Sequence, residues 1–223
     1  MTGNQFWDFM MGMSRAIMRI IVEIIHRLLI NIFDTLFGFV KWPEKKLRIK
    51  VLLLKTPHPD PDILPHDINT AINYAKEVFR KNFNVKIIPV QNTESFAETL
   101  DSIPPYEVLH TKGGTGALTE EFKAAGNFFA AYLRAPIYPV TVYVVMSIKG
   151  ATGCSLGPLT DYVTLDHGAA RETSILAHEL AHACGLWHLQ DKENLLWNRK
   201  NRGDKTNWWQ KNICRSSRHV TYW

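Results

Sequence analysis

The stretch TSILAHELAHACGLWH, residues 173–188, carries the strongest pattern in the chain. His178 and His182 lie four positions apart, and a glycine, Gly185, precedes a third histidine, His188. Side chains four positions apart project from the same face of a helix, so two imidazole rings would lie together there. Gly185 stands where this helix must end, because glycine adopts a left-handed turn at little cost. The chain can then reverse and return His188 to the other two rings.

Three histidines with this spacing predict a zinc site. A catalytic zinc ion takes three protein ligands and leaves a fourth position for water, whereas a structural site is closed by a fourth protein ligand. Glu179 follows the first ligand without being one, so its carboxylate can accept a proton from the zinc-bound water. We therefore expect one Zn²⁺ held by His178, His182 and His188, with Glu179 as catalytic base. Ca²⁺ is possible, but no acidic loop pattern specifies a site for it.

A metal-free helix with surface histidines and a closed zinc site are the two alternatives. The nearest thiol, Cys184, lies two positions after His182 and points to a different side of the helix, so we interpret it as a core residue. The chain has three cysteines, Cys154, Cys184 and Cys214. They are too few for a disulfide framework, and one disulfide or buried free thiols remain open.

Strand and helix patterns alternate through residues 47–185, which predicts a mixed α/β sheet with helices packed on it. A loop rich in Pro and Asp is expected at 56–67, and Asp67 is expected to cap the helix that follows. The expected strands are residues 47–54, 85–90, 140–148 and 162–165, and the expected helices are residues 67–82, 119–133, 173–184 and 206–216.

Residues 5–40 form a long amphipathic pattern with a wide apolar face and a narrow polar stripe that includes Glu23, Arg27 and Asp34. Three arrangements are open: a helix lying in a membrane surface with these charges in water, a spanning helix in a bundle, and a helix packed on its own domain or a partner. No cleavable signal peptide is evident. Trp7 and Trp42 flank the pattern, which favours a membrane surface as a partner through residues 5–42.

The formal net charge is +5, and its distribution is uneven. Residues 51–190 are mildly acidic, and basic residues gather at 41–50 and 191–223. This distribution argues against nucleic acid as a partner and fits contact with anionic lipid headgroups.

The pattern HExxHxxGxxH of residues 178–188 resembles that of the metzincin clan of zinc peptidases. The resemblance implies a zincin-like α+β fold, with a mixed twisted sheet, an active-site helix and a small C-terminal subdomain. On this basis we divide the chain into an amphipathic segment, an upper subdomain and a lower subdomain, with boundaries at 1–46, 47–185 and 186–223. Residues 153–157 resemble the edge strand that binds substrate in such enzymes, although a plain loop would look similar.

One departure from the clan concerns the turn that follows the third histidine. Glu193, Asn194, Leu195 and Leu196 resemble its methionine turn, at the spacing of the matrixin branch, with Leu196 in the methionine position. Leucine supplies similar volume, so the exchange weakens the assignment to a branch more than the assignment of activity. Trp197 is a candidate for the wall of the specificity pocket.

Together these patterns predict a membrane-associated zinc endopeptidase, extracytoplasmic rather than cytoplasmic, that acts on peptides or proteins. A peptide-binding module without turnover and a membrane-surface protein with secondary peptidase activity are the alternatives. The oligomeric state is left open. The remaining histidines lack ligand spacing, and among them His167 lies nearest the motif in the sequence.

Overall fold

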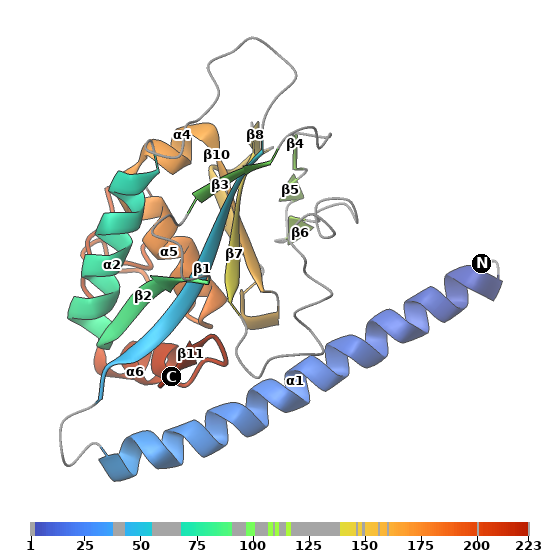
Figure 1. Ribbon diagram of the computed structural model, residues 1–223, viewed down its shortest axis with the longest axis horizontal. Coiled ribbons are helices and arrows are strands. Elements are labelled where there is room, and N and C mark those ends of the chain that lie inside the picture. The colour runs from blue at the N-terminus through green and yellow to red at the C-terminus, as the bar shows by residue number, and fades with distance from the viewer. Residues whose placement is uncertain are drawn as a thin grey trace.

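A mixed sheet with helices on one face forms the body of the molecule, and one long helix runs beneath it (Figure 1). The computed structural model describes residues 3–37, 43–54, 68–90, 97–100, 107–108, 110–111, 115–116, 139–145, 147–148, 150–155, 157–159, 161–199 and 201–222. The predicted loop at 56–67 and the predicted helix at 119–133 lie outside these residues.

The central sheet has the strand order β11-β1-β7-β10-β9, and β2 and β3 pair with successive parts of β1. β1, β2, β3, β7 and β10 run parallel, whereas β11 and the edge strand β9 pair antiparallel. These strands are β1 (Lys45–Leu54), β2 (Val85–Pro89), β3 (Ala97–Leu100), β7 (Val140–Val145), β9 (Gly153–Ser155), β10 (Tyr162–Asp166) and β11 (Val220–Thr221). The short strands β4 (Glu107–Val108), β5 (His110–Thr111), β6 (Thr115–Gly116) and β8 (Ser147–Ile148) form two small pairings apart from it.

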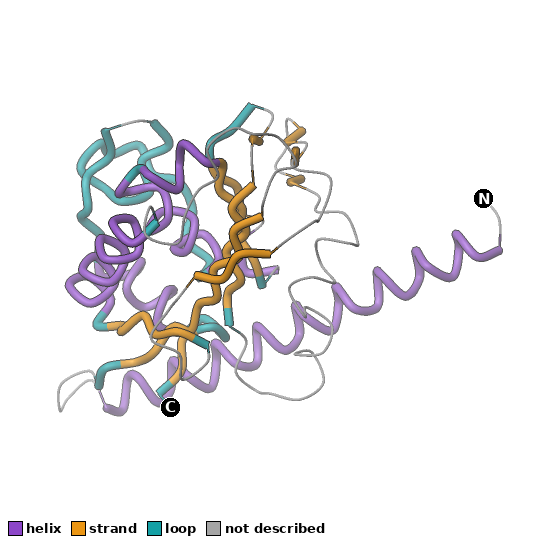
Figure 2. Tube along the Cα trace, turned by 45° about the horizontal axis from the view of Figure 1, so that its top comes forward, coloured by secondary structure: helices purple, strands orange, loops and turns teal. Residues whose placement is uncertain are grey.

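Helices cover one face of this sheet, as the tube view shows (Figure 2). The helical elements are α1 (Gly3–Phe37), α2 (Asn69–Phe83), η2 (Gly157–Leu159), α4 (His167–Arg171), α5 (Thr173–Ala183) and α6 (Trp208–Arg215). The main core lies between α2, α5 and the strands, where alternate residues of β1 such as Leu47, Ile49 and Val51 meet the buried faces of the helices. Apolar residues at every second position of β1 and apolar residues at helical spacing in α2 therefore face each other in one buried layer.

The predicted mixed α/β fold is confirmed, and the expected strands and helices that fall in the described residues are present within a few positions. Helix α2 begins after Ile68 without a side-chain cap, and the predicted cap Asp67 lies outside the described residues. The helix ends because Asn84 adopts a left-handed conformation with φ of 54°. Of the stretch 153–157, residues 153–155 form the edge strand β9 and Gly157 begins η2, so this part of the chain is not a plain loop.

Helix α1 contacts the domain with its polar stripe. Glu23 is 6% exposed and Asp34 is 3% exposed, although both belong to a long surface helix. Arg218 pairs with Glu23 at 3.3 Å, and Lys45 pairs with Asp34 at 2.9 Å. Of the three arrangements, the one that leaves these two carboxylates in water is therefore wrong, because cationic groups of the domain bind them. The polar side of α1 is thus packed on the chain's own domain, which was one of the three open arrangements.

The apolar side of α1 faces outward, which reverses the usual orientation of an amphipathic surface helix. Among the described residues, no helix has a window apolar enough to cross a membrane. The boundary near residue 46 and the division at residue 185 remain predictions.

Candidate metal centre

Helix α5 carries His178, Glu179 and His182, and the chain reverses directly after it. Cys184 is the C-cap, and Gly185 has φ of +93°, in the left-handed region that favours glycine. A Cβ atom on Gly185 would lie 2.5 Å from Nη2 of Arg27 in α1, so the guanidinium would have to shift if residue 185 carried a side chain. The reversal predicted at Gly185 is thus present, and Arg27 of α1 binds the main chain there through the Cys184 oxygen.

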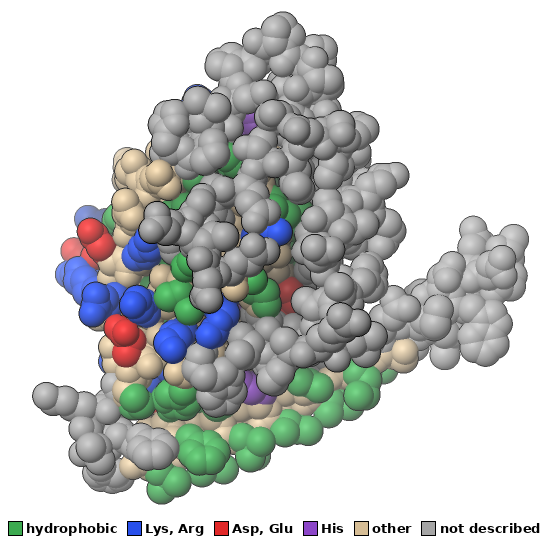
Figure 3. Space-filling view, viewed as in Figure 1, with side chains coloured by type: hydrophobic (Ala, Val, Ile, Leu, Met, Phe, Trp, Pro, Cys, Tyr) green, Lys and Arg blue, Asp and Glu red, His purple; other side chains and the backbone are tan. Residues whose placement is uncertain are grey.

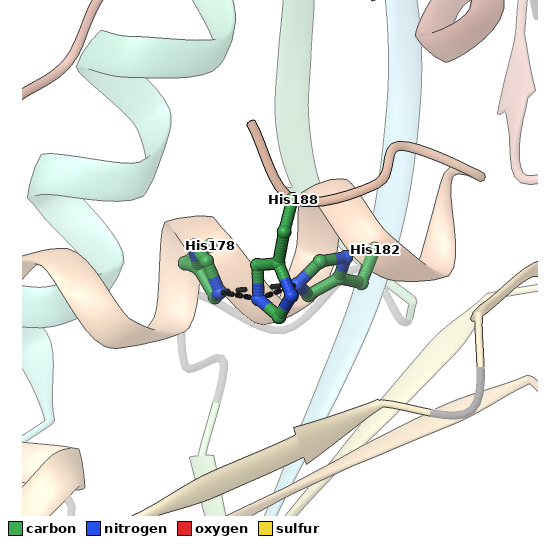
Figure 4. Close-up of side chains that lie close together, drawn as sticks. All are labelled: His178, His182 and His188. Atoms are coloured by element: carbon green, nitrogen blue, oxygen red, sulfur yellow. Dashed lines mark hydrogen bonds between the residues drawn. The ribbon is translucent and has the colours of Figure 1, made fainter. Parts of the chain in front are cut away.

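The three predicted ligands come together at this reversal, with their rings pointing toward one another (Figure 4). The Nε2 atoms of His178 and His182 are 3.0 Å apart. Nε2 of His188 lies 3.2 Å from that of His178 and 3.1 Å from that of His182. Nitrogen ligands about 2.0 to 2.1 Å from a tetrahedral zinc ion are separated by about 3.3 Å. The spacing of the three nitrogens therefore fits one zinc ion.

Main-chain carbonyl groups determine which ring nitrogens carry hydrogen. His178 Nδ1 lies 2.8 Å from the Leu195 oxygen, and His182 Nδ1 lies 2.7 Å from the Leu186 oxygen. A carbonyl oxygen can only accept, so both Nδ1 atoms are donors and both Nε2 atoms of the neutral rings carry lone pairs. Two lone pairs facing each other at 3.0 Å repel unless a cation lies between them. The Nε2 atoms are thus oriented as ligands for a metal ion, which would relieve this repulsion.

The turn that follows His188 packs against the histidine cluster and holds one of its rings in place. Asn194 accepts a hydrogen bond from the Leu196 N–H at 2.9 Å, which closes the turn, and Leu195 supplies the carbonyl that binds His178. Leu196 is fully buried and accepts a hydrogen bond from the Leu189 N–H at 3.1 Å. The predicted turn therefore exists, with Leu196 in the core and its main chain hydrogen-bonded to Leu189, the residue after His188.

Glu179 lies against the edge strand β9. A Cβ atom on Gly153 would lie only 2.9 Å from Glu179 Oε1 and 3.0 Å from its Cγ, so the carboxylate occupies the place that a side chain at 153 would need. The same Cβ atom on Gly153 would also lie 3.0 Å from Cγ2 of Ile175. Glycine at 153 thus lets α5 and β9 approach closely enough to hold Glu179 between them.

Burial keeps the histidines neutral and favours the protonated form of Glu179. Burial, followed by the neighbouring His182 ring, lowers the pKa of His178 to about 2, and burial lowers that of His182 to about 4. Burial lowers the pKa of the more exposed His188 as well. In contrast, burial raises the pKa of Glu179 to about 8, and the charge of Arg202 opposes that rise. Neutral imidazoles are the form that binds a metal ion.

Sequence reasoning did not find the roles of Gly153 and Arg202. Arg202 acts electrostatically on Glu179 and on all three histidines, and its Nε and Nη1 atoms are buried without a hydrogen-bond partner among the described residues. No local pattern marks either residue, because each reaches the site only through the tertiary fold. His167 starts α4 and does not join the cluster of potential ligands in the described part of the chain.

The three cysteines are buried free thiols, so of the two alternatives left open by the sequence, a disulfide or free thiols, the structure shows the second. Burial, together with a hydrogen bond to Cys184, raises the pKa of Cys214. Cys184 belongs to the core, as expected, and is not part of the histidine cluster. Trp197 is partly buried and lies 5.7 Å from the Arg199 guanidinium; its predicted place in a specificity pocket stays a prediction.

Comparison with known proteins supports the fold. No protein family matches this sequence, and no curated protein matches it. Among solved structures, metalloproteinase-II from Bacteroides fragilis is similar, with a TM-score of 0.50 and 15% sequence identity. The chain has a metallopeptidase-like fold. The similarity covers 76% of this chain and 53% of that chain, so this chain spans about half the length of the solved structure.

Proposed function

We propose that this chain is a zinc-dependent endopeptidase of the metzincin type. The observation that carries the proposal is the convergence of three neutral imidazoles, two of them oriented by main-chain carbonyls so that their Nε2 lone pairs face one another. The buried carboxylate of Glu179 on the same helix supports it. His178, His182 and His188 would hold the ion. When bound, zinc supplies a Lewis acid that polarises a peptide carbonyl and makes water acidic near neutral pH.

Glu179 is the proposed general base. Burial raises its pKa to about 8, so without a metal ion the carboxyl group is largely protonated at neutral pH. The positive charge of a bound ion would lower that pKa and favour the ionised carboxylate, which is the form that accepts a proton. The carboxylate would take a proton from the attacking water and pass it to the nitrogen of the leaving amine. Its packing against Gly153 limits the positions that it can adopt, so the proton-accepting group is held in place before substrate arrives.

The edge strand β9 is the proposed substrate platform. In the described residues it pairs with β10 on one side, and it stands at the end of the sheet order. An extended peptide can add to such an edge through main-chain hydrogen bonds. Because Gly153 touches Glu179, a peptide on β9 would lie beside the catalytic base. A binding module without turnover would share this platform, but it would have no use for a buried carboxylate next to the proposed ligands.

Removal of the metal tests the proposed function directly. We expect the purified full-length chain to contain about one zinc ion and to cleave unstructured peptides internally. A chelator such as 1,10-phenanthroline should abolish cleavage, and added Zn²⁺ should restore it. Metal analysis by mass spectrometry should follow the activity through removal and return. Full cleavage by protein shown to be free of metal would contradict the proposal.

Replacement of Gly153 tests the position of the base. In Gly153→Ala the new methyl group would meet Glu179 Oε1 and Ile175, so the carboxylate must move. We expect kcat to fall by about a hundredfold, because catalysis is sensitive to displacements near 1 Å, whereas zinc content should stay unchanged. Thr152→Ala is the matched control, since Thr152 is an exposed neighbour on the same segment. Equal activities of the two variants would show that β9 does not position Glu179.

A further inference from the structure

The outward side of α1 is a continuous apolar surface. Its large side chains between Ile17 and Leu36 are each 41% to 64% exposed, and they form a green band along the helix in the space-filling view (Figure 3). The band consists of Ile17, Met18, Ile20, Ile21, Val22, Ile24, Ile25, Leu28, Leu29, Ile32, Phe33 and Leu36. At 1.5 Å per residue it is about 29 Å long. Soluble monomers rarely expose an apolar surface of this extent.

Polar contacts on the other side fix the direction in which this surface points. Arg27 donates to the Cys184 and Ile213 oxygens at 3.1 Å and 2.8 Å, and Asp34 binds the buried Lys45. Rotation of α1 that covered its apolar side would break these contacts and leave Lys45 buried without an anion. The apolar surface is therefore held outward by the fold itself.

Basic side chains border the apolar surface. Lys46, Arg48 and Lys50 alternate with buried residues along β1, so they lie on the sheet face opposite α2, and Lys86 of β2 is exposed beside them. In Figure 3, Lys and Arg side chains gather above the C-terminal half of α1. The combination of an apolar surface with a basic border complements the acyl and anionic headgroup layers of a membrane surface.

The shape of the molecule suits a flat partner. Helix α1 is a single straight rod along one side, and its N-terminal part extends beyond the rest of the domain (Figure 1). A planar surface can contact the whole length of the rod. We propose that α1 docks this protein on a membrane surface that carries anionic lipid headgroups, with the helix lying in the plane of the surface and its polar side on the catalytic domain.

Vesicle binding by the full-length chain tests this proposal independently of peptide hydrolysis. We expect the protein to float with vesicles of phosphatidylcholine containing about 30% phosphatidylserine, and to bind more weakly at high salt or to phosphatidylcholine alone. The double variant Leu28→Glu, Ile32→Glu places two charges in the apolar band. It should lower the partition coefficient at least about tenfold, with unchanged zinc content and thermal midpoint.

The matched control carries the same added charge elsewhere. Asn69→Glu, Thr70→Glu changes two exposed residues at the start of α2, at the opposite end of the domain from α1 in Figure 1, and should bind vesicles like the unaltered protein. Equal vesicle binding by the α1 variant and the unaltered protein would overturn the proposal. It would also be overturned if the unaltered chain ignored vesicles and formed a dimer that the α1 variant dissociated, because the apolar surface would then bind a second copy.

Discussion

Glu179→Gln is expected to abolish peptide hydrolysis while the protein keeps its zinc. The amide has the size and shape of the carboxylate, so it fits the same place against Gly153, but it cannot accept the proton of the attacking water. Loss of a general base lowers rates by about 10²- to 10⁴-fold. Because Glu179 is not among the clustered ligands, metal content should be unchanged. Peptide cleavage and zinc analysis on the same preparation measure both quantities.

Glu172→Gln provides the control for this prediction. Glu172 precedes α5, is exposed, and makes no side-chain capping bond to the helix, so the same chemical change there should leave cleavage intact. If Glu179→Gln cleaved at the original rate, the assigned base would be wrong. If it lost its zinc, Glu179 would be shown to hold the metal site together, and the fall in activity would say nothing about proton transfer.

Asp34→Ala is expected to produce the largest loss of stability among single changes at the α1 contact. Asp34 lies 2.9 Å from Lys45 Nζ and 3.5 Å from Arg215 Nε, and Tyr222 donates its hydroxyl to it. Lys45 and Arg215 are both fully buried. Without the carboxylate, two cations would remain close together in the interior. Breaking a buried pair in this way costs about 3 to 5 kcal/mol in the free energy of unfolding.

Urea denaturation of the full-length protein measures this cost. Asp204→Ala is the matched control, because Asp204 pairs with Lys81 at 2.6 Å on the surface, where both side chains are more than a third exposed. The control should lose less than about 1 kcal/mol. Similar losses in the two variants would contradict the inference that α1 is an integral part of the folded domain. A truncated protein that begins after α1 would lack Asp34 altogether.

The local parts of the site could be predicted from the sequence. His178, Glu179 and His182 share one helix, and Gly185 ends it, so their relation follows from helical geometry over a few residues. A run rich in β-branched residues similarly predicted β7, and a shorter apolar run predicted β10. Where a feature depends on neighbours in the chain, the residue pattern was sufficient.

The environment of α1 could not be predicted in this way. Helical periodicity shows that Glu23, Arg27 and Asp34 lie on one face, but it does not show what that face contacts. Their partners, such as Ile213 and Arg218, are distant in sequence and meet α1 only in the folded chain. The same holds for Glu179 and Gly153, whose contact requires β9 to stand beside α5.

The carbonyl groups that orient His178 and His182 belong to the main chain, and every residue type has one. Evolution can therefore exchange the side chains at 186 and 195 for others of similar volume without altering the donors that face the ion. Asn194 has less freedom, because its amide binds both the Leu196 N–H and the Gln210 side chain. Selection on this centre would thus act on the course of the main chain and on the side-chain amides of Asn194 and Gln210. Most of the surrounding residues could be replaced by others.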